Sequence, residues 1–257
     1  MSLHPNPRIV AIIPSRYKST RFPGKSLAMI AGKSLIQRTY ENAKRCELIE
    51  EWIVATDDQR IFDHVKSFGG NVVMTPEMPS GTDRLAYVLK QLPYLLDAEI
   101  IINIQGDEPS LDSESIKSVI RILQNDDSAV MSTGIFPLKS LEEARNPNHV
   151  KCVIDLNHNA LYFSRSLIPG CLPTKKPEEI IYYKHLGIYA FRPDFLLKYA
   201  EMPLTPLQQI EDLEQLKVLE NGYKIKAAIV QKINVDVNAP EDIAKVELEL
   251  CKQNLFS

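Results

Sequence analysis

The sequence lacks the features that mark several large protein classes. It has no apolar run near the ~20 residues that a membrane helix needs, and its start, MSLHPNPRIV, has no charged end followed by an apolar core, as a signal peptide has. The four cysteines form no CxxC pair and the five histidines no HxxxH or HxH unit, which argues against a disulfide framework and a zinc site. We therefore expect a cytoplasmic protein with reduced thiols.

Three common catalytic or nucleotide-binding motifs are also missing. The dinucleotide fingerprint GxGxxG and the hydrolase elbow GxSxG do not occur. GKS occurs twice, but a Walker P-loop needs a glycine five positions before Gly24 or Gly32, and Ser19 and Leu27 stand there. A phosphate site in this chain must therefore be built in another way.

Acidic residues are absent from the first 40 positions, although the chain is slightly acidic overall. Its 257 residues are 44% hydrophobic and 25% charged with a formal net charge of -3, which is typical of a folded protein and gives no reason to expect nucleic acid or an acidic membrane as a partner. A solvated basic face is the simpler explanation of basic residues without acidic ones in the first 40 positions. Because the basic side chains share a loop with Ser, Thr, Gly and Pro directly after an apolar strand, we favour an anion site. The basic residues are Arg8, Arg16, Lys18, Arg21, Lys25, Lys33 and Arg38.

Short apolar runs alternate with segments of helical period, which predicts parallel strands joined by helices. The predicted strands are 9–13, 52–55, 72–74, 100–104 and 129–135, and the predicted helices are 34–45, 59–68, 82–92 and 113–124. After about residue 140 we predict a hairpin (150–156 with 160–163), a strand at 182–191, a helix at 206–220, a strand at 225–230 and a last helix from Pro240. We expect one α/β layer with an inserted region on the substrate side.

Charged residues follow several of the predicted strands, where open α/β sheets bind their ligands. The basic loop follows the first strand, Thr56-Asp57-Asp58 the second, and Gln105-Gly106-Asp107-Glu108-Pro109 the fourth; Asp236 and Asn238 lie in NVDVNAPED near the end. A single Asp after a strand is more often a turn or helix cap than a metal ligand. Carboxylates at several strand ends, opposite basic side chains, favour a Mg²⁺–polyphosphate site.

Several segments resemble the 3-deoxy-manno-octulosonate (Kdo) cytidylyltransferase family, the CMP-Kdo synthetases. The resemblance extends in order from Ile9 to Lys245. The segments are IIPSRYKSTRFPGKSL, VATDDQRI, SGTDRLA, NIQGDEPSL, ALYFSRSLIP, HLGIYAF, PLQQIEDLEQLKVLENG and APEDI.

The resemblance implies a single Rossmann-like nucleotidyltransferase domain over residues 1–257, with a mostly parallel sheet and an inserted sugar-side or dimerisation region at about 140–190. It implies transfer of CMP from CTP to the anomeric hydroxyl of Kdo, releasing diphosphate, for lipopolysaccharide biosynthesis. Mg²⁺ is the implied cofactor and a homodimer the implied assembly, with no nucleic-acid or membrane partner.

The resemblance also implies roles for individual residues. Lys25 and Asp107 would be catalytic, and Asp107 the principal Mg²⁺ ligand. The residues that would bind the nucleotide are Arg16, Arg21, Lys25, Ser80, Gly81, Thr82 and Arg84. Those that would bind the acid sugar are Gln105, Arg165, His185, Tyr189 and Glu214. Without the resemblance, we would interpret His185 and Tyr189 as packing residues, Arg165 as part of a surface ion pair and Glu214 as solvated.

One departure from the family concerns the metal. The family usually has VDTPED, whereas this chain has Asn238 in place of that Asp and carries Asp236 two residues earlier. Either Asp236 reaches the metal, or Asn238 offers a neutral amide oxygen. A cytidylyltransferase for another acid sugar is the nearest alternative function, and a module that senses CTP without chemistry is an alternative of a different class.

Overall fold

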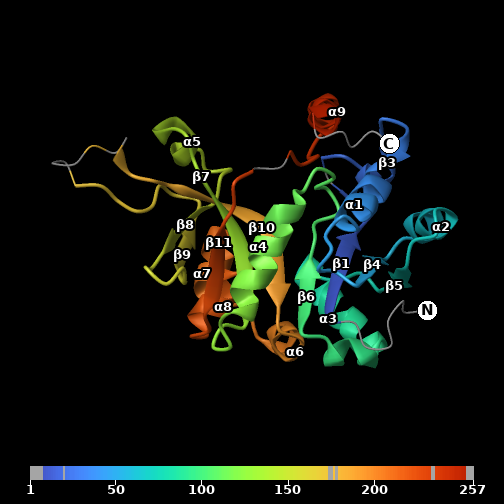
Figure 1. Cartoon of the computed structure of the whole chain (residues 1–257), viewed down its shortest axis with the longest axis horizontal. Coiled ribbons are helices and arrows are strands. Elements are labelled where there is room, and N and C mark those ends of the chain that lie inside the picture. The colour runs from blue at the N-terminus through green and yellow to red at the C-terminus, as the bar shows by residue number, and fades with distance from the viewer. Residues whose placement is uncertain (1–7, 20, 173–175, 177–178, 233–234, 253–257) are drawn as a thin grey trace. The chain divides into compact units, whose positions relative to one another are not determined.

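The computed structural model describes residues 8–19, 21–172, 176, 179–232 and 235–252 of the chain (Figure 1). They belong to two compact units. The first holds residues 1–117, 192–200 and 233–257, and the second holds residues 118–191 and 201–232. The expectation that the whole chain forms one domain stays a prediction.

The first unit is built on four parallel strands, as the sequence predicts. They are β1 (Ile9–Ser15), β4 (Glu51–Thr56), β5 (Val72–Met74) and β6 (Ile100–Asn103), in the order β6-β1-β4-β5. Nearly all the side chains of β1, β4 and β6 are buried, which explains why these strands are largely apolar. The chain adds β4 and β5 on one side of β1 and β6 on the other. β1 and β6 therefore flank the point where the direction of winding reverses, which is where open sheets of this class hold ligands.

Helices connect these strands, and each begins at a side chain that caps its first turn. The hydroxyl or carboxylate of the capping residue accepts a hydrogen bond from a backbone N–H that would otherwise lack a partner. The helices with their caps are α1 (Leu35–Ala43, Ser34), α2 (Gln59–Ser67, Asp58) and α3 (Gly81–Gln91, Ser80). α2 stops before Gly69, whose φ of 79° suits glycine. Short 3₁₀ turns cover Lys25–Leu27 and Pro93–Asp97.

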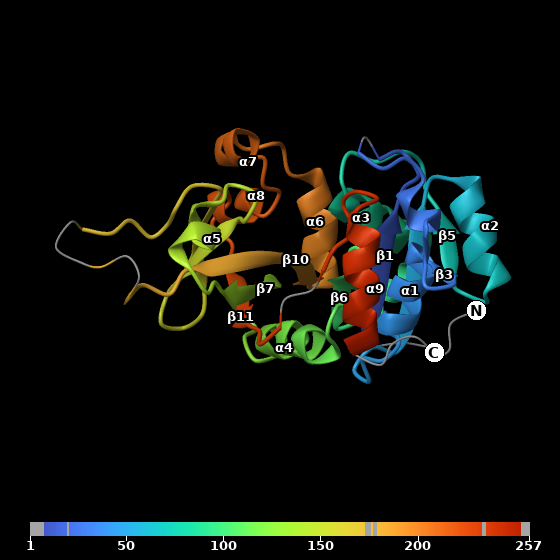
Figure 2. The ribbon, with the colours of Figure 1, turned by 90° about the horizontal axis from the view of Figure 1, so that it is seen from above.

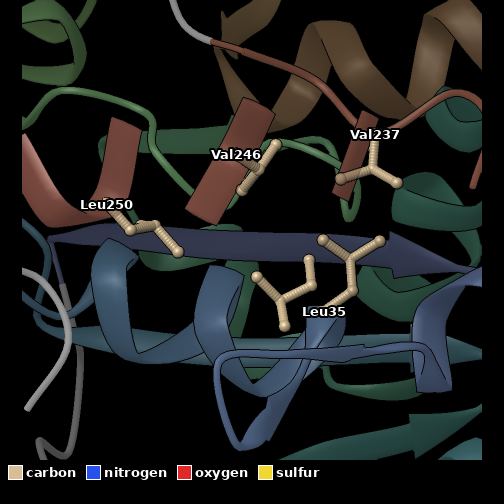
Figure 3. Packing of buried hydrophobic residues seen from close by; sticks show 5 residues of the cluster. Leu35, Val237, Val246 and Leu250 are labelled. Atoms are coloured by element: carbon tan, nitrogen blue, oxygen red, sulfur yellow. The ribbon is translucent and has the colours of Figure 1, made fainter. Parts of the chain in front are cut away.

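The end of the chain packs onto the start of this unit. α9 (Asp242–Lys252) lies beside α1 and near a two-strand ribbon, β2 (Met29–Ile30) with β3 (Lys33–Ser34), in Figure 2. The contact is a cluster of fully buried apolar side chains, four of which Figure 3 labels. The cluster consists of Ile30, Leu35, Val237, Val246 and Leu250. It fixes the segment that carries Asn238.

The second unit holds a mixed sheet. β10 (Tyr183–Phe191) runs antiparallel to β7 (Met131–Pro137) and to β8 (Lys151–Ile154), β9 (Ala160–Ser164) runs antiparallel to β8, and β11 (Ile225–Ile229) runs parallel to β7. The predicted hairpin and the two later strands are therefore confirmed. Together with the parallel strands of the first unit, they confirm the α/β class.

One predicted helix is wrong in its extent. The segment 206–220 forms two short helices, α7 (Pro206–Glu211) and α8 (Leu216–Glu220), because Asp212 adopts a left-handed conformation with φ 53°. Asp is one of the few side chains that tolerates this region. The remaining helices are α4 (Ser113–Gln124), as predicted, and α5 (Leu141–Arg145) and α6 (Pro193–Glu201), which the periodicity did not predict. None of the helices that the structure describes is long and apolar enough to cross a membrane.

Candidate active site

A cavity of about 240 Å³ opens at the carboxyl ends of β1 and β6, at the reversal of winding in the first unit. Its walls come from the basic loop after β1, the segment after β6 and the segment before α9. Basic and acidic side chains thus meet where the order of strands places a ligand site. The lining residues are Pro14, Ser15, Arg16, Ser19, Arg21, Lys25, Ser26, Gln105, Gly106, Asp107 and Asn238.

The basic loop is closed by its own backbone. The N–H of Gly24 donates to the carbonyl of Tyr17 at 3.0 Å, and Gly24 has a φ of 71°. A Cβ at Gly24 would lie 3.0 Å from the Tyr17 ring, so both the conformation and the space require glycine. The guanidinium of Arg60, held by Asp58, stacks 3.3 Å from the centre of the same ring. Tyr17 therefore anchors the loop that presents Lys25.

Lys25 and Asp107 form the central ion pair of the cavity. The ammonium of Lys25 lies 2.6 Å from Oδ2 of Asp107, and both side chains are largely buried, with 16% and 28% of their surfaces exposed. Such a pair is screened by water much less than a surface pair. It joins residues 82 positions apart, the two that the resemblance marks as catalytic.

The segment after β6 approaches the end of β1 very closely. A Cβ at Gly106 would lie 2.9 Å from the carbonyl oxygen of Pro14, so only glycine allows this approach. The hydroxyl of Thr39 in α1 donates to the carbonyl of Gly106, and the carbonyl of Asp107 accepts from the N–H of Val237. Backbone contacts on both sides therefore fix the position of Asp107.

Asn238 shares the cavity with Asp107, whereas Asp236 is not among the lining residues. Arg21 donates to Oδ1 of Asn238 at 2.8 Å, and Nδ2 of Asn238 donates to the carboxylate of Asp236. The backbone N–H of Asn238 donates to Asp242, the first residue of α9, at 3.0 Å. Asn238 therefore joins the basic loop to the segment 236–242. Whether Asn238 or Asp236 binds a metal stays a prediction.

The side chains of the cavity are suited to Mg²⁺ that is bound jointly by the protein and by substrate phosphates. They are less suited to a metal ion whose ligands all come from the protein. Among the described residues, no three His, Cys, Asp or Glu side chains form a group that could hold a metal ion. Mg²⁺ usually keeps several waters and takes one or two carboxylates together with substrate phosphates. One carboxylate, Asp107, beside an amide oxygen and three basic side chains matches that requirement.

The predicted nucleotide-binding residues of α3 lie beside this cavity. Ser80 caps the helix by accepting from the N–H of Asp83, and a Cβ at Gly81 would lie 3.3 Å from Pro14, a lining residue. Thr82 is buried, and buried Arg84 forms an ion pair with Asp57 at 3.0 Å and donates to Thr75. Arg84 thereby ties together the residues that follow β4 and β5, and a role for it toward cytidine stays a prediction.

The predicted sugar-binding residues other than Gln105 belong to the second unit. Arg165 follows β9, and its backbone N–H donates to a carboxylate oxygen of Glu211 at 2.9 Å. Its Nε donates to the carbonyl of Glu211 at 2.8 Å, and one Nη donates to the carbonyl of Asp212 at 3.3 Å. The side chain remains 40% exposed. Arg165 is thus held mainly by carbonyl groups, and among the described residues its guanidinium forms one ion pair, at 3.8 Å with the exposed Asp212 carboxylate.

His185 is buried on β10 and hydrogen bonded to Thr133 at 3.0 Å. The Thr133 hydroxyl also meets the carbonyls of Leu186 and Ile188, and its single proton must go to a carbonyl, so we assign the N–H to Nε2 of His185. Nδ1 is then an acceptor without a partner among the described residues. Burial, with a smaller contribution from Lys184, lowers the pKa of His185 to about 3, so the ring is neutral at pH 7.

Tyr189 packs against His185, with ring centres 5.5 Å apart, and donates to Oε1 of Gln215 at 3.3 Å. Gln215 is almost fully buried, and its Nε2 has no hydrogen-bond partner in the part of the chain that is described. Glu214, the predicted sugar ligand, precedes it and is half-buried. A buried amide donor without a partner costs free energy unless a water or ligand satisfies it. Gln215 thus joins the candidate sugar site.

A family model described as "Cytidylyltransferase" matches residues 10–226. The chain is 56% identical to the 3-deoxy-manno-octulosonate cytidylyltransferase of Protochlamydia amoebophila (strain UWE25), over 97% of this chain and 96% of that protein. It is 45% identical to the mitochondrial protein of that name from Arabidopsis thaliana, over 96% of this chain and 85% of the relative. The chain belongs to the 3-deoxy-manno-octulosonate cytidylyltransferase family.

Solved structures agree with membership of this family. One described as CMP:2-keto-3-deoxy-manno-octonic acid synthetase complexed with CTP is 37% identical, with a TM-score of 0.88 over 96% of this chain and 99% of the other. A 4-diphosphocytidyl-2C-methyl-D-erythritol synthase from Anaerococcus prevotii is 17% identical, with a TM-score of 0.59, and shares the fold.

Sequence reasoning missed several residues that lie around the candidate sugar site. Gln215 is adjacent to a predicted ligand, but nothing in its neighbourhood distinguishes it from the other polar residues of that segment. Glu211 and Thr133 act through contacts with residues 46 and 52 positions away, and no local pattern could reveal them. The signal that was available for Gln215 is weak: it is one of several Gln and Glu residues around a segment predicted as a single helix.

Proposed function

We propose that this chain transfers CMP from CTP to the anomeric hydroxyl of Kdo, forming CMP-Kdo and diphosphate. The observation that carries the proposal is the paired Lys25 and Asp107 in a basic cavity at the reversal of winding. A cation for phosphate and a carboxylate for metal are what nucleotidyl transfer requires of a protein. The family membership and the likeness to a CTP-bound synthetase support the choice of substrates.

On the nucleotide side, the basic loop neutralises the triphosphate. Arg16 and Arg21 are exposed at the cavity and Lys25 lies deeper in it. Charges in a partly buried cavity act on phosphate more strongly than the same charges in water. The residues therefore bind and orient the triphosphate so that the diphosphate leaves in line with the incoming sugar hydroxyl.

Mg²⁺ is the proposed cofactor, held by Asp107 together with Asn238 or Asp236. When bound, it would neutralise phosphate charge and lower the pKa of the attacking hydroxyl. Arg21 and Asn238 would keep the segment 236–242 joined to the basic loop around it. The ligand identity is tested in the Discussion.

On the sugar side, Arg165 is the proposed partner of the Kdo carboxylate. Its guanidinium is suited to a planar carboxylate because it can donate two parallel hydrogen bonds. Nδ1 of His185 can accept from a sugar hydroxyl, and Nε2 of Gln215 can donate to one. A buried site built on such pairs rejects sugars that leave its polar groups without partners.

Diphosphate release from CTP and Mg²⁺ tests the function, measured with Kdo, with sialic acid and with no sugar. We expect diphosphate release when Kdo is present, and none with sialic acid or without a sugar. Release with sialic acid in its place would assign another acid sugar. CTP binding without release under all three conditions would make the chain a CTP-sensing module and contradict the proposal.

A homodimer is the proposed assembly. An apolar groove of about 540 Å³ lies on the second unit, within the predicted inserted region at 140–190. Leu161 and Ile181 in this groove are 60% and 62% exposed. A contiguous exposed apolar surface of this kind is typical of protein interfaces, and a second copy of the chain would bury it by two-fold pairing.

A further inference from the structure

Lys151, the first residue of β8, is fully buried, with 0% of its surface exposed. Its ammonium has three donors, and each has an acceptor: the carbonyls of Asn146 at 3.0 Å, His149 at 2.6 Å and Arg165 at 2.6 Å. No carboxylate forms an ion pair with Lys151 among the residues that the structure describes. Hydrogen bonds to three main-chain oxygens therefore offset the cost of burying this charge.

A charge in this position has a specific structural effect. Burying an ammonium is costly unless its hydrogen bonds are all made, so the three carbonyls must stay close around it. Asn146 and His149 belong to the turn before β8, whereas Arg165 follows β9, which makes Lys151 the link between the two segments.

The residue that Lys151 holds is Arg165, the proposed partner of the sugar carboxylate. Lys151 fixes the carbonyl of Arg165, and Glu211 fixes its N–H and its Nε. The backbone of Arg165 is thus held on both sides of its Cα, and its side chain is held at Nε. The outer edge of the guanidinium, where one Nη also donates to the carbonyl of Asp212 at 3.3 Å, is the part proposed to meet a ligand.

We propose that Lys151 is a positioning residue for the acid sugar, which acts through Arg165 and does not touch the substrate. The inference rests on the proposed function, because it assumes that Arg165 binds the sugar carboxylate. A two-point bond between guanidinium and carboxylate tolerates little displacement. Removing the ammonium frees the Arg165 carbonyl and lets the guanidinium move out of place.

Lys151→Met tests the proposal because methionine keeps an unbranched side chain of nearly the same length and loses the charge. Lys226→Met is the matched control: Lys226 is 8% exposed in the same unit, donates to the carbonyl of Asn157 at 2.7 Å and pairs with Asp126 at 3.0 Å, with no contact to Arg165. We expect Lys151→Met to raise the KM for Kdo at least about 10-fold, with the KM for CTP and kcat within about 3-fold. Lys226→Met should leave both KM values unchanged.

A double-mutant cycle with Arg165→Ala identifies the route of the effect. If Lys151 acts through Arg165, Lys151→Met adds little to the KM for Kdo once the guanidinium is gone. If Lys151→Met raised the KM for Kdo by the same factor in wild type and in Arg165→Ala, the proposal would be overturned. An unchanged KM for Kdo in a folded Lys151→Met would overturn it as well. Lys151→Gln, which retains two N–H donors, should give an intermediate KM.

The outcomes separate this inference from the function on which it rests. A wild-type protein that releases no diphosphate with Kdo overturns both. A wild-type protein active on Kdo, with Lys151→Met and Lys226→Met changing the KM for Kdo alike, overturns the positioning role alone. Failure of both Lys151 variants to fold, while Lys226→Met folds, would give Lys151 a purely structural role and overturn it too.

Discussion

The ammonium of Lys25 lies 2.6 Å from the carboxylate of Asp107. The group proposed to face the triphosphate and the group proposed to hold the metal therefore neutralise each other. A metal–nucleotide complex offers each of them a new partner of opposite charge at the same time. Neither charge has to be left alone in a partly buried cavity.

Lys25→Met should lower kcat/KM for CTP by at least about 100-fold, because a cation next to reacting phosphate oxygens is lost from a shielded site. Lys33→Met is the control: Lys33 pairs with Glu41 at 2.8 Å in the same unit but outside the cavity. Steady-state kinetics with varied CTP measures the effect. Equal kinetics in the two variants would show that Lys25 does not contact the triphosphate.

Asp107→Asn should nearly abolish activity at any Mg²⁺ concentration while the protein stays folded, because Mg²⁺ prefers anionic oxygen. Diphosphate release across a Mg²⁺ titration measures the first effect, and thermal unfolding the second. Substantial activity restored at high Mg²⁺ would assign the principal metal ligand elsewhere.

Asn238→Asp should lower the Mg²⁺ concentration required for half-maximal activity, because it adds a carboxylate to the cavity that Asp107 lines. Asp236→Ala should raise that concentration only if Asp236 is the second ligand. A higher requirement in Asn238→Ala than in Asp236→Ala would select the amide oxygen, and the reverse order would select the Asp236 carboxylate.

His185 should make the protein less stable in acid. Its folded-state pKa of about 3 lies below the value of about 6.5 in an unfolded chain, so the unfolded state binds the extra proton first. The free energy of unfolding is therefore fully retained above pH 6.5 and falls as the pH drops toward 3, by up to about 1.4 kcal/mol for each pH unit.

Urea unfolding of wild type and His185→Gln between pH 5 and 7 measures this contribution. The slope of the free energy of unfolding against pH should be smaller in His185→Gln than in wild type. His158→Asn is the control, because His158 is exposed in a turn with φ 61°, which Asn tolerates. Identical slopes in wild type and His185→Gln would mean that His185 titrates alike in both states.

Leu161→Glu and Ile181→Glu should each convert a dimer into a monomer, because a charge placed in an apolar contact loses its hydration. Light scattering over a wide concentration range measures the mass. Leu248→Glu is the matched control, since Leu248 is 65% exposed on α9 of the other unit. A wild-type monomer at every concentration, or a dimer that survives both substitutions, would contradict the proposed surface.

Local pattern was enough to predict most of the fold. Apolar runs predict β1, β4, β5 and β6 to within two residues, and in β1, β4 and β6 they do so because nearly every side chain is buried, which favours a continuous apolar strand. The break between α7 and α8 could not be predicted, because it depends on the backbone of a single residue, Asp212, in a segment of otherwise helical composition.

The candidate site was predictable only in part. The basic loop is visible because Arg16, Lys18, Arg21 and Lys25 fall within ten positions with no acidic residue between them, and Asp107 because it follows a strand. The bond between Arg21 and Asn238 joins residues 217 positions apart, and sequence alone does not pair them. Lys151 lies in the predicted strand 150–156, and its burial was not predicted, because it depends on three surrounding carbonyls.

The packing of α9 against α1 sets the order in which the cavity can be assembled during synthesis. Lys25 and Asp107 leave the ribosome first, and the wall that contains Asn238 is held in place by Val246 and Leu250, which follow later in the chain. In a nascent chain, the sheet of the first unit can therefore form before all walls of the cavity have been synthesised. A chain that lacks α9 carries the basic loop without the packing that holds one wall of the pocket.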